Sequence, residues 1–530
     1  MVPVSDAVVI GSGPNGLVAA NLLADAGWSV TVLEAKPTPG GAVRTDTEVY
    51  PGFRHDTFSA FYPLAAASHT IRSLHLEDHG LTWLHAPAVL GHPLTDGTWS
   101  MLYRDRDRTA ASLDRLHPGD GQAWLDLCAR WDIFGDDLIE ALLQPFPPVR
   151  AGSRFLLNLS RAGGLSALGL PLVSVRRLGE RIFGGEGARL LLAGNALHAD
   201  FAPSNAGSGI FGLILVMLGQ TVGFPVPQGG AGEPITALAR RLESLGGTIV
   251  TNAEATSVVV VDGRAVGVRL ADGEQVSATR AVVANVSAPA LYGGLVSLDD
   301  LPARTRWGMK RFRWDPSTIK VDWALSSPVP WDPAPPDAPG TVHIAHSVDE
   351  LAGFAAQIKG STVPAAPLLL VGQMTATDPT RSPAGTESLW AYTHVPQQTR
   401  SDAGGAGIRG AWDSSDLERM ADRMQARIAR FAPGLADRIL SRRAMGPREF
   451  EAADANLHGG AINGGTAALR QELVLRPVPG MGRPETPIKG LFLGSASAHP
   501  GGGVHGAPGA NAAKAALAHD RARQRASHRH

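Results

Sequence analysis

A strand–turn–helix–strand pattern in residues 6–34 restricts the possible folds of this 530-residue chain more than any other segment does. The short apolar run Asp6–Ile10 ends at a glycine-rich turn, and apolar side chains at helical spacing follow it. Gly27 ends the expected helix, Val30–Leu33 forms a second strand, and Glu34 lies at the carboxyl end of that strand. This order predicts a βαβ unit that binds a dinucleotide.

The residue types in the turn suit contact with phosphate groups. Gly11 permits the tight turn, Gly13 lets the backbone approach a pyrophosphate without a Cβ in the way, and Gly16 allows close packing of the helix on the strand. The amino terminus of the helix would present unpaired N–H groups and the positive end of its dipole to the phosphates. A glycine-rich turn in another kind of α/β domain is the alternative, and the second strand and its terminal acid weigh against it.

The acid at residue 34 restricts the type of dinucleotide. A carboxylate at this place can accept hydrogen bonds from both ribose hydroxyls and would repel a 2′-phosphate. We therefore expect a dinucleotide with a free ribose, which both FAD and NAD provide. The residues predicted to hold it are Gly11, Ser12, Gly13, Pro14, Asn15, Gly16, Glu34 and Ala35.

A second glycine-rich segment, Pro39–Thr45, comes shortly after the acid and favours FAD. Its glycine pair and its arginine would place further backbone donors and a guanidinium near the dinucleotide, which domains that bind only NAD do not usually need. The segment resembles the GG-containing motif of the flavin amine oxidase and phytoene desaturase superfamily, where this motif helps to hold FAD. Gly52–Asp56 is similar to the superfamily's continuation. The resemblance adds Gly41, Ala42 and Arg44 to the predicted FAD site.

Composition narrows the choice of partners. The 48 Lys and Arg residues nearly balance the 49 Asp and Glu residues, so the net charge of -1 would not draw the protein to nucleic acid. Cys128 is the only cysteine, which excludes an intramolecular disulfide, a CxxC redox pair and a thiolate metal cluster. No leader pattern precedes Asp6, so we expect a cytoplasmic protein with small-molecule partners and no metal, and peripheral membrane contact stays an open alternative.

In residues 57–225, Leu, Ala, Trp and Arg recur at helical spacing and prolines interrupt the pattern, which predicts a mainly helical insertion. Its most apolar piece, Ile210–Leu218, is too short to span about 30 Å of hydrocarbon. We expect this piece to be a buried core helix. A wall of an apolar substrate cavity and contact with a membrane surface are the alternatives.

The chain then returns to the nucleotide domain. Residues 258–270 are expected to form a β-hairpin around Asp262-Gly263, and Arg280–Ala284 is expected to be a further strand. This order resembles the second segment of the superfamily's FAD domain. In that segment the residue at the position of Ala255 commonly contacts the adenine half of FAD through its backbone.

Residues 296–456 are expected to supply the sheet of a substrate domain. Strands are predicted at 318–325, 368–374 and 388–394, and a long helix at 416–431. Four aromatic and basic residues near the start of this region could shape a pocket, but we expect them to form a surface face. They are Trp307, Arg311, Arg313 and Trp314.

The closing motif, Lys489–Ala507, predicts a strand, a glycine-rich loop and a helix that continues to about His519. Beside a flavin, the N–H groups at the start of that helix would stabilise negative charge at the N1/O2 edge during reduction. A purely structural glycine-rich turn is the alternative. The predicted contacts are Gly494, Ser495, Gly503, Val504, His505 and Ala507. His499 and His505 could titrate near neutrality, but we expect them to pack or to orient the loop, so no catalytic residue is assigned.

Taken together, the Gly11–Glu34 unit and the closing motif resemble the phytoene-desaturase-like branch of FAD-dependent oxidoreductases over nearly the whole chain. Within it the chain looks similar to proteins labelled pyridine nucleotide-disulphide oxidoreductase domain proteins, although one cysteine cannot perform disulphide chemistry. The resemblance implies an α/β fold, with a Rossmann-like FAD-binding domain of the amine oxidase type and a discontinuous α+β substrate domain. The expected FAD-binding segments are 1–70, 226–295 and 457–519, the substrate segments are 71–225 and 296–456, and 520–530 is expected to be a basic disordered tail.

The resemblance also implies the chemistry. A substrate C–H bond would deliver hydride to flavin N5, a second proton would leave, and a double bond would form in an apolar or amphipathic substrate, carotenoid-like or otherwise lipophilic. The alternatives are C–N oxidation as in amine oxidases, isomerisation with recycled reduced FAD, and a non-catalytic lipid-binding or chaperone role. Asn463–Thr466 departs from the aromatic or histidine-containing segment of many relatives, so the substrate edge is expected to differ.

Overall fold

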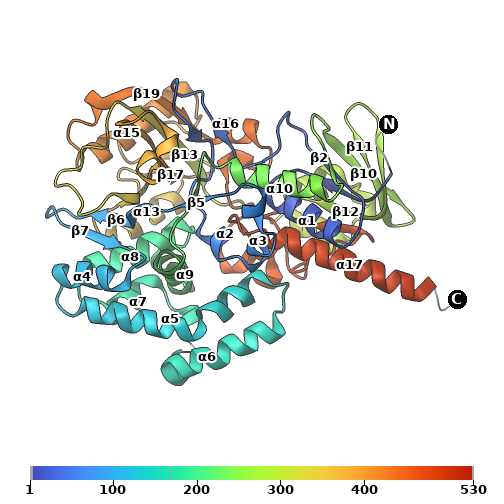
Figure 1. The fold of residues 1–530 in the computed structure, drawn as a ribbon, viewed down its shortest axis with the longest axis horizontal. Helices are drawn as coiled ribbons and strands as arrows, with labels where there is room; N and C mark the ends of the chain where they lie inside the picture. Colours follow the sequence, from blue (N-terminus) through green and yellow to red (C-terminus); the bar gives the residue numbers. More distant parts are fainter. Residues whose placement is uncertain (1–3, 168, 528–530) are drawn as a thin grey trace.

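The computed structural model describes residues 4–167 and 169–527, and it arranges them around two seven-stranded sheets. Figure 1 shows strands β10–β12 of the first sheet at the right, strands β13 and β17 of the second sheet at the upper left, and helices α4–α9 below the second sheet. Sheets covered by helices confirm the expected α/β fold with an α+β second domain.

The first sheet combines three segments that lie far apart in the sequence. Its order is β10 (Ala255–Val261), β11 (Arg264–Leu270), β12 (Gln275–Ala284), β1 (Ser5–Ile10), β2 (Val30–Leu33) and β9 (Thr248–Val250), and β20 (Leu491–Leu493) pairs with β12. β1 runs parallel to both β2 and β12, and β20 runs parallel to β12. The antiparallel pair β10–β11 is the expected hairpin around Asp262-Gly263.

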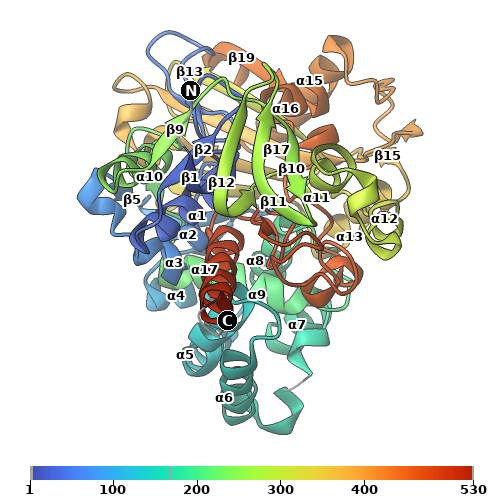
Figure 2. The ribbon, with the colours of Figure 1, turned by 90° about the vertical axis from the view of Figure 1, so that its right-hand side faces the viewer.

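Helices α1 (Pro14–Asp25), α10 (Glu233–Ser244) and α17 (Ala507–Ser527) belong to the same domain as the first sheet. Figure 2 looks along α17 and shows α1 beside it, with the strands of the first sheet above them. Buried side chains such as Leu17, Leu238 and Ala512 join these helices to β1 and β12 in one apolar cluster. Burial of this surface fixes the positions of the helix amino termini relative to the strand ends.

The second sheet has the order β19 (Ile439–Met445), β13 (Ser317–Leu325), β17 (Glu387–Val395), β16 (Leu369–Gln373), β14 (Pro339–Ile344), β6 (Ala88–Pro93) and β7 (Trp99–Leu102). Side chains alternate between the faces of β13. Ile319, Val321 and Trp323 pack in the cluster that includes residues of α15 (Ser414–Ala429). The side chains of Thr318, Lys320 and Asp322 therefore lie on the opposite face of β13, away from α15.

The helical insertion consists of α4 (Arg106–Leu116), α5 (Asp120–Leu143), α6 (Val149–Ala167), α7 (Val175–Ile182), α8 (Glu186–His198) and α9 (Ser208–Thr221). Leu213, Val216 and Met217 of α9 are at most 1% exposed and pack in the largest apolar cluster. This confirms that 210–218 is part of a core helix. Within the described ranges, no helix is both long enough and apolar enough to cross a membrane.

The expectation of a disordered tail is wrong for residues 520–527, because α17 continues to Ser527. Asp520 is 6% exposed and accepts hydrogen bonds from Arg523 at 2.9 Å and Arg280 at 3.3 Å. Alanine, arginine and glutamine have high helix propensities, so these residues extend the helix into solvent once Asp520 is anchored. Residues 528–530 lie outside the described part of the chain.

Candidate functional site

The turn between β1 and α1 has the geometry that its glycines predict. Gly11 adopts a φ of 89°, and a Cβ there would lie 2.9 Å from the Asn285 carbonyl oxygen at the end of β12. A Cβ on Gly16 would lie 2.1 Å from the Gly11 carbonyl oxygen, so the helix can approach the turn only with glycine at this position. Helix α1 begins at Pro14, and its first turn points its free N–H groups out of the glycine-rich turn.

Glu34 lies where the sequence places it, at the carboxyl end of β2, and is 7% exposed. Its Oε2 accepts hydrogen bonds from the Ser12 amide at 3.0 Å and the Ser12 hydroxyl at 2.5 Å, and its Oε1 accepts one from the Lys36 amide at 2.9 Å. Ala35 follows it and is exposed. The carboxylate therefore holds the glycine-rich turn that is predicted to bind phosphate.

We expect Glu34→Ala to weaken FAD binding at least tenfold, because each hydrogen bond to a carboxylate contributes about 1.5–3 kcal/mol. Glu34→Gln, which keeps the shape and one acceptor but loses the charge, should fall between the wild type and the alanine variant. Titration of the apoprotein with FAD, followed by quenching of flavin fluorescence, measures both dissociation constants. Equal affinity in all three proteins would contradict the assignment of Glu34 to the cofactor.

The second glycine-rich segment lies directly against the first. A Cβ on Gly41 would lie 3.1 Å from the Gly13 Cα, so the two loops meet backbone to backbone, and Ala42 and Arg44 follow in the same loop. The Arg44 Nε is buried and has no hydrogen-bond partner among the described residues. A buried guanidinium nitrogen without a partner is costly, and a pyrophosphate oxygen would satisfy it.

Asp454, for which no motif predicts a role, also lies beside the second glycine-rich segment. Its Oδ2 would lie 3.3 Å from a Cβ on Gly41, and its Oδ1 accepts the Asn456 amide at 3.0 Å. Burial raises the pKa of Asp454, while Arg44 lowers it and Glu34 raises it. It comes from a segment about 400 residues further along the chain, and no local motif marks it.

The closing loop brings a second helix terminus to the same site. Gly494 donates its N–H to the Ala284 carbonyl at 2.9 Å, next to the end of β12, and α17 begins at Ala507. A Cβ on Gly509 would lie 1.9 Å from the Asn15 carbonyl oxygen, so the first turns of α1 and α17 touch. The other residues predicted to contact FAD in this loop lie between Gly494 and Ala507 and have local partners. The Ser495 hydroxyl accepts the Ser497 amide at 3.2 Å, and the His505 ring accepts the Ala507 amide at 3.1 Å. Gly503 faces Leu64, and Val504 packs on the core of the first sheet.

These features fit a bound FAD. The amino termini of α1 and α17 lie beside two glycine-rich loops whose backbones meet without side chains between them. The buried Glu34 carboxylate and the unpartnered Arg44 Nε lie at the same place. The Asn15 Oδ1 is also buried without a partner among the described residues. Ala255 begins β10, two positions after Ala253, whose amide donates to the Glu34 carbonyl at 2.8 Å. All of the segments selected from the sequence are therefore gathered around the same turn.

His499 and His505 do not titrate near neutrality in this structure. Burial lowers the pKa of each to about 4, so both rings are neutral at pH 7. The His499 Nε2 lies 2.9 Å from the Gln144 carbonyl oxygen, and the His505 Nε2 lies 3.2 Å from the Gly502 carbonyl oxygen. These contacts support the expected role in packing and in orienting the loop.

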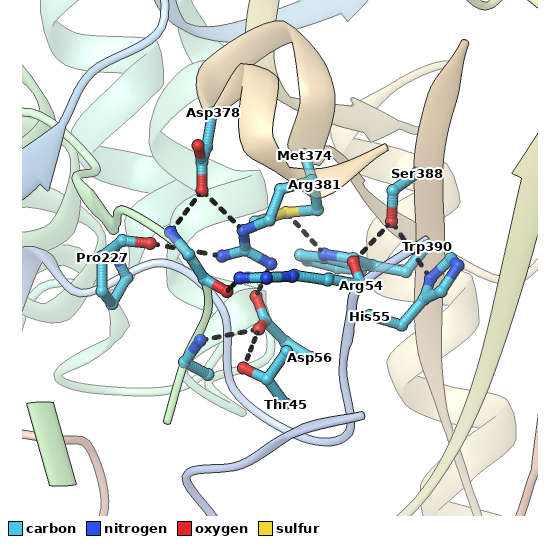
Figure 3. A network of polar contacts seen from close by, with 12 residues as sticks. Thr45, Arg54, His55, Asp56, Pro227, Met374, Asp378, Arg381, Ser388 and Trp390 are labelled. Carbon is cyan, nitrogen blue, oxygen red and sulfur yellow. Dashed lines mark hydrogen bonds and ion pairs between the residues drawn. The ribbon is translucent and has the colours of Figure 1, made fainter. Parts of the chain in front are cut away.

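Arg381 joins the predicted FAD-binding segments to the segment before β17. Figure 3 shows its guanidinium between Asp378 and Asp56. The Arg381 Nε lies 2.8 Å from the Asp378 Oδ2, and a terminal guanidinium nitrogen lies 2.9 Å from the Asp56 Oδ2. All three side chains are fully buried. Asp56 also accepts the Ala231 amide at 2.7 Å, and Asp378 accepts the Gly229 amide at 2.8 Å. Arg381 and its two acids thus tie together three separate segments, at Asp56, at 229–231 and at 378–381.

A cavity of about 880 Å³ lies in the second domain. Its wall combines the end of α8, the segment before β13, α13 (Val348–Lys359), the end of β17 and the 458–470 segment. The exposed Arg313 and the half-buried Trp314 line it, so these two residues shape a pocket, which was the alternative to a surface face. Trp307 is 54% exposed and stacks under Arg311 at 3.7 Å, so the expectation is confirmed for that pair.

Two ionisable side chains meet at the inner end of the cavity. The Asp200 Oδ1 lies 3.2 Å from the His394 Nε2, and both side chains are almost fully buried. Asp200 adopts a φ of 64°, which is uncommon for a residue other than glycine, and Asn463 Nδ2 donates to its Oδ2. Burial raises the pKa of Asp200 to about 7 and lowers that of His394 to about 4. Such opposed shifts in a cavity are typical of functional groups.

Asn463 connects this pair to the closing loop. Its side chain bonds Asp200, and a Cβ on Gly502 would lie 2.7 Å from its Oδ1. Arg476, which is 1% exposed, holds the connection by donating to the carbonyls of Asn463 at 2.8 Å and Ala496 at 2.7 Å. The Asn463–Thr466 segment therefore lies between the predicted flavin loop and the cavity. Sequence reasoning missed Asp200 and His394, and neither lies in a recognisable motif.

Comparison with known proteins identifies two matching family models. The model described as NAD(P)-binding Rossmann-like domain matches residues 9–75, and the model described as flavin containing amine oxidoreductase matches residues 165–386. The pyridine nucleotide-disulfide oxidoreductase domain-containing protein 2 of Mus musculus is 30% identical, with 96% of this chain and 93% of the relative covered. The lycopene-forming phytoene desaturase of Pseudescherichia vulneris is 25% identical, with 96% and 98% covered. The structure of a putrescine oxidase bound to putrescine matches with a TM-score of 0.60 at 18% identity, over 97% of this chain and 98% of that one.

Proposed function

From its membership of the family of pyridine nucleotide-disulfide oxidoreductase domain-containing protein 2, we propose that the chain is an FAD-dependent dehydrogenase or desaturase. It would oxidise a C–H bond of an apolar or amphipathic molecule. The family lies within the flavin amine oxidase and phytoene desaturase superfamily. The chain is a flavin-containing oxidoreductase, and its cofactor is FAD. The substrate class and the roles of individual residues are the proposal.

The observation that carries the proposal is the position of the Asp200–His394 pair. The pair lies at the inner end of a cavity whose volume suits a small-molecule ligand. Through Asn463 it reaches the loop that opens α17. An acid–base pair between a cavity and a predicted flavin loop is what a dehydrogenation needs, because one hydrogen leaves as hydride and the other as a proton.

The roles of this chain's residues follow from their protonation states. FAD, when bound, supplies the two-electron acceptor. His394 is neutral above a pH of about 4 and can take up a proton, and Asp200 becomes an acceptor as it ionises near pH 7. Asn463 holds Asp200 in place. The buried Asp315 and the half-buried Tyr392 and His198 are the other titratable groups that interact with this pair. The pair would accept the proton from the carbon next to the one that loses hydride.

The test of the proposed function is anaerobic reduction of the purified flavoprotein. We expect the flavin absorbance to bleach with terpenes, polyenes or lipophilic alcohols. Bleaching by amines alone, with peroxide release in air, would instead support the second candidate, C–N oxidation. That candidate is favoured by the match of residues 165–386 to the flavin containing amine oxidoreductase model. A purified protein without flavin absorbance would overturn both.

With the compound that reduces the flavin, the reduction rate should rise with pH through about 7 and level off, because Asp200 accepts protons only when ionised. Asp200→Asn should lose this rise and be about tenfold slower at pH 8, since His394 still remains. Asp349→Asn, at a side chain that is 83% exposed, is the matched control and should keep the wild-type profile. An unchanged profile in Asp200→Asn would exclude Asp200 as a proton acceptor.

A further inference from the structure

The charges around the cavity are distributed unevenly. Arg313, Lys359 and Arg470 line its wall, and all three residues are exposed. None of the three forms an ion pair with another described residue, whereas Arg442, Arg443 and Arg476 each do. They come from three different segments: the loop before β13, the last residue of α13, and the short helix at Leu469–Gln471. The outer part of the cavity is therefore cationic.

The acids of the cavity wall lie at its inner end and already accept hydrogen bonds from other residues of the protein. Asp315 is fully buried and accepts the amides of Ile462 at 2.7 Å, Asn463 at 2.9 Å and Gly465 at 3.1 Å. Asp200 is bonded to Asn463 and faces His394. Neither carboxylate is free to balance the cations at the outer end, and neither offers a solvated charge to an ammonium group.

One part of the cavity wall is apolar and aromatic. Phe201 stacks on Phe211 with ring centroids 4.0 Å apart, and Phe312 packs edge-on against Trp314 at 5.1 Å. Phe354 and Ile358 of α13 complete this wall. Aromatic rings of this kind contribute large apolar area to a ligand and cost little conformational entropy.

From this arrangement we propose that the cavity binds an amphipathic anion, with its carboxylate or phosphate at Arg313, Lys359 and Arg470 and its apolar body along the aromatic wall. The proposal rests on the proposed function in one respect, which is that the cavity is the substrate site. It adds a substrate class to that function: an acid with an apolar chain or ring system, whose reacting carbon reaches Asp200 and His394. The cationic outer end would hold the anion away from the buried pair.

Binding to the holoenzyme tests the proposal without turnover. The probes are decanoate, decyl phosphate, decanol and decylamine, measured by calorimetry at low and at high salt. We expect decanoate or decyl phosphate to bind at least tenfold more tightly than decanol, decylamine to bind most weakly, and the preference for the anion to shrink at high salt because exposed charges are screened. The two anions distinguish a carboxylate from a phosphate ligand.

The variant Arg313→Gln/Lys359→Gln/Arg470→Gln should bind the preferred anion about tenfold more weakly and decanol unchanged. Arg115→Gln/Arg130→Gln/Arg150→Gln is the matched control, because it removes three exposed arginines that do not line the cavity. Decanol binding as tightly as both anions, or an equal loss of anion binding in both triple variants, would overturn the proposal. If no compound reduces the flavin but the cavity triple variant loses anion binding, the proposed reaction is wrong and the anion site is confirmed. If a compound reduces the flavin but the cavity triple variant binds the anion normally, the reaction is supported and the anion site is wrong.

Discussion

Gly13→Val is expected to give a folded protein that retains less than about a tenth of the wild-type FAD. A Cβ at residue 13 would lie 3.0 Å from the Asn285 Nδ2 and 3.9 Å from the Gly41 Cα, so valine methyl groups would fill the space between the two glycine-rich loops. That space is where a pyrophosphate must approach the backbone. The position has a φ of -65°, so the substitution adds volume without backbone strain.

The flavin content is measured from the ratio of absorbance at 450 nm to that at 280 nm, and the fold from circular dichroism of the apoprotein. Gly353→Val in α13 is the control, because a Cβ there meets nothing within 4 Å. It should retain full flavin. Gly16→Val should instead fail to fold, since its Cβ would lie 2.1 Å from the Gly11 carbonyl oxygen. Normal flavin in Gly13→Val would show that the cofactor lies elsewhere.

Arg381→Met is expected to lower the free energy of unfolding by about 3–5 kcal/mol, the range for a buried ion pair that loses one partner. The substitution leaves Asp56 and Asp378 buried without their counter-charge, although each keeps a backbone amide. The remaining amide hydrogen bonds and the packing of the methionine side chain cannot offset the cost of two buried carboxylates without a counter-charge. Chemical denaturation at pH 7 measures the loss.

Two further variants show whether burial is the cause. Arg381→Lys keeps the charge but cannot bond both carboxylates with a planar fork, so it should lose less stability than the methionine variant. Arg409→Met removes an arginine whose side chain is 62% exposed and should change stability by at most about 1 kcal/mol. Equal losses for Arg381→Met and Arg409→Met would rule out the role of Arg381 as a buried connection.

Much of the nucleotide-binding part could be predicted because its signals are local. The turn between β1 and α1, the acid after β2, the Asp262-Gly263 hairpin and the strand–loop–helix at 491–507 are each specified by a few neighbouring residues. Glycine is required at position 11 by its φ of 89° and at position 16 by the nearby Gly11 carbonyl oxygen of the same unit. The tail prediction failed because high helix propensity, together with one buried acid at residue 520, extended α17 beyond the expected end.

The cavity could not be predicted in the same way. Arg313 and Trp314 look like exposed residues in sequence, and they line a cavity only because α8, α13 and the 458–470 segment fold against them. Asp200 and His394 are 194 positions apart, and Asp454 reaches the glycine loop from a distant segment. Their chemistry depends on burial, which shifts the pKa values of Asp200 and His394 in opposite directions.

The sequence by itself determined the βαβ unit, because short-range backbone geometry and periodicity encode it, and the acid after β2 predicted a dinucleotide with a free ribose. The resemblance that pointed to FAD came from the glycine-rich motifs near both ends of the chain. Only the tertiary structure decided which polar and charged groups lie together. Glu34 accepts hydrogen bonds from Ser12, Arg381 lies between two acids, and Asp200 lies beside His394 at the end of a cavity with a cationic outer end. The physical reason is that desolvation and Coulomb interaction depend on distance in space and on burial. Neither quantity is set by separation along the chain.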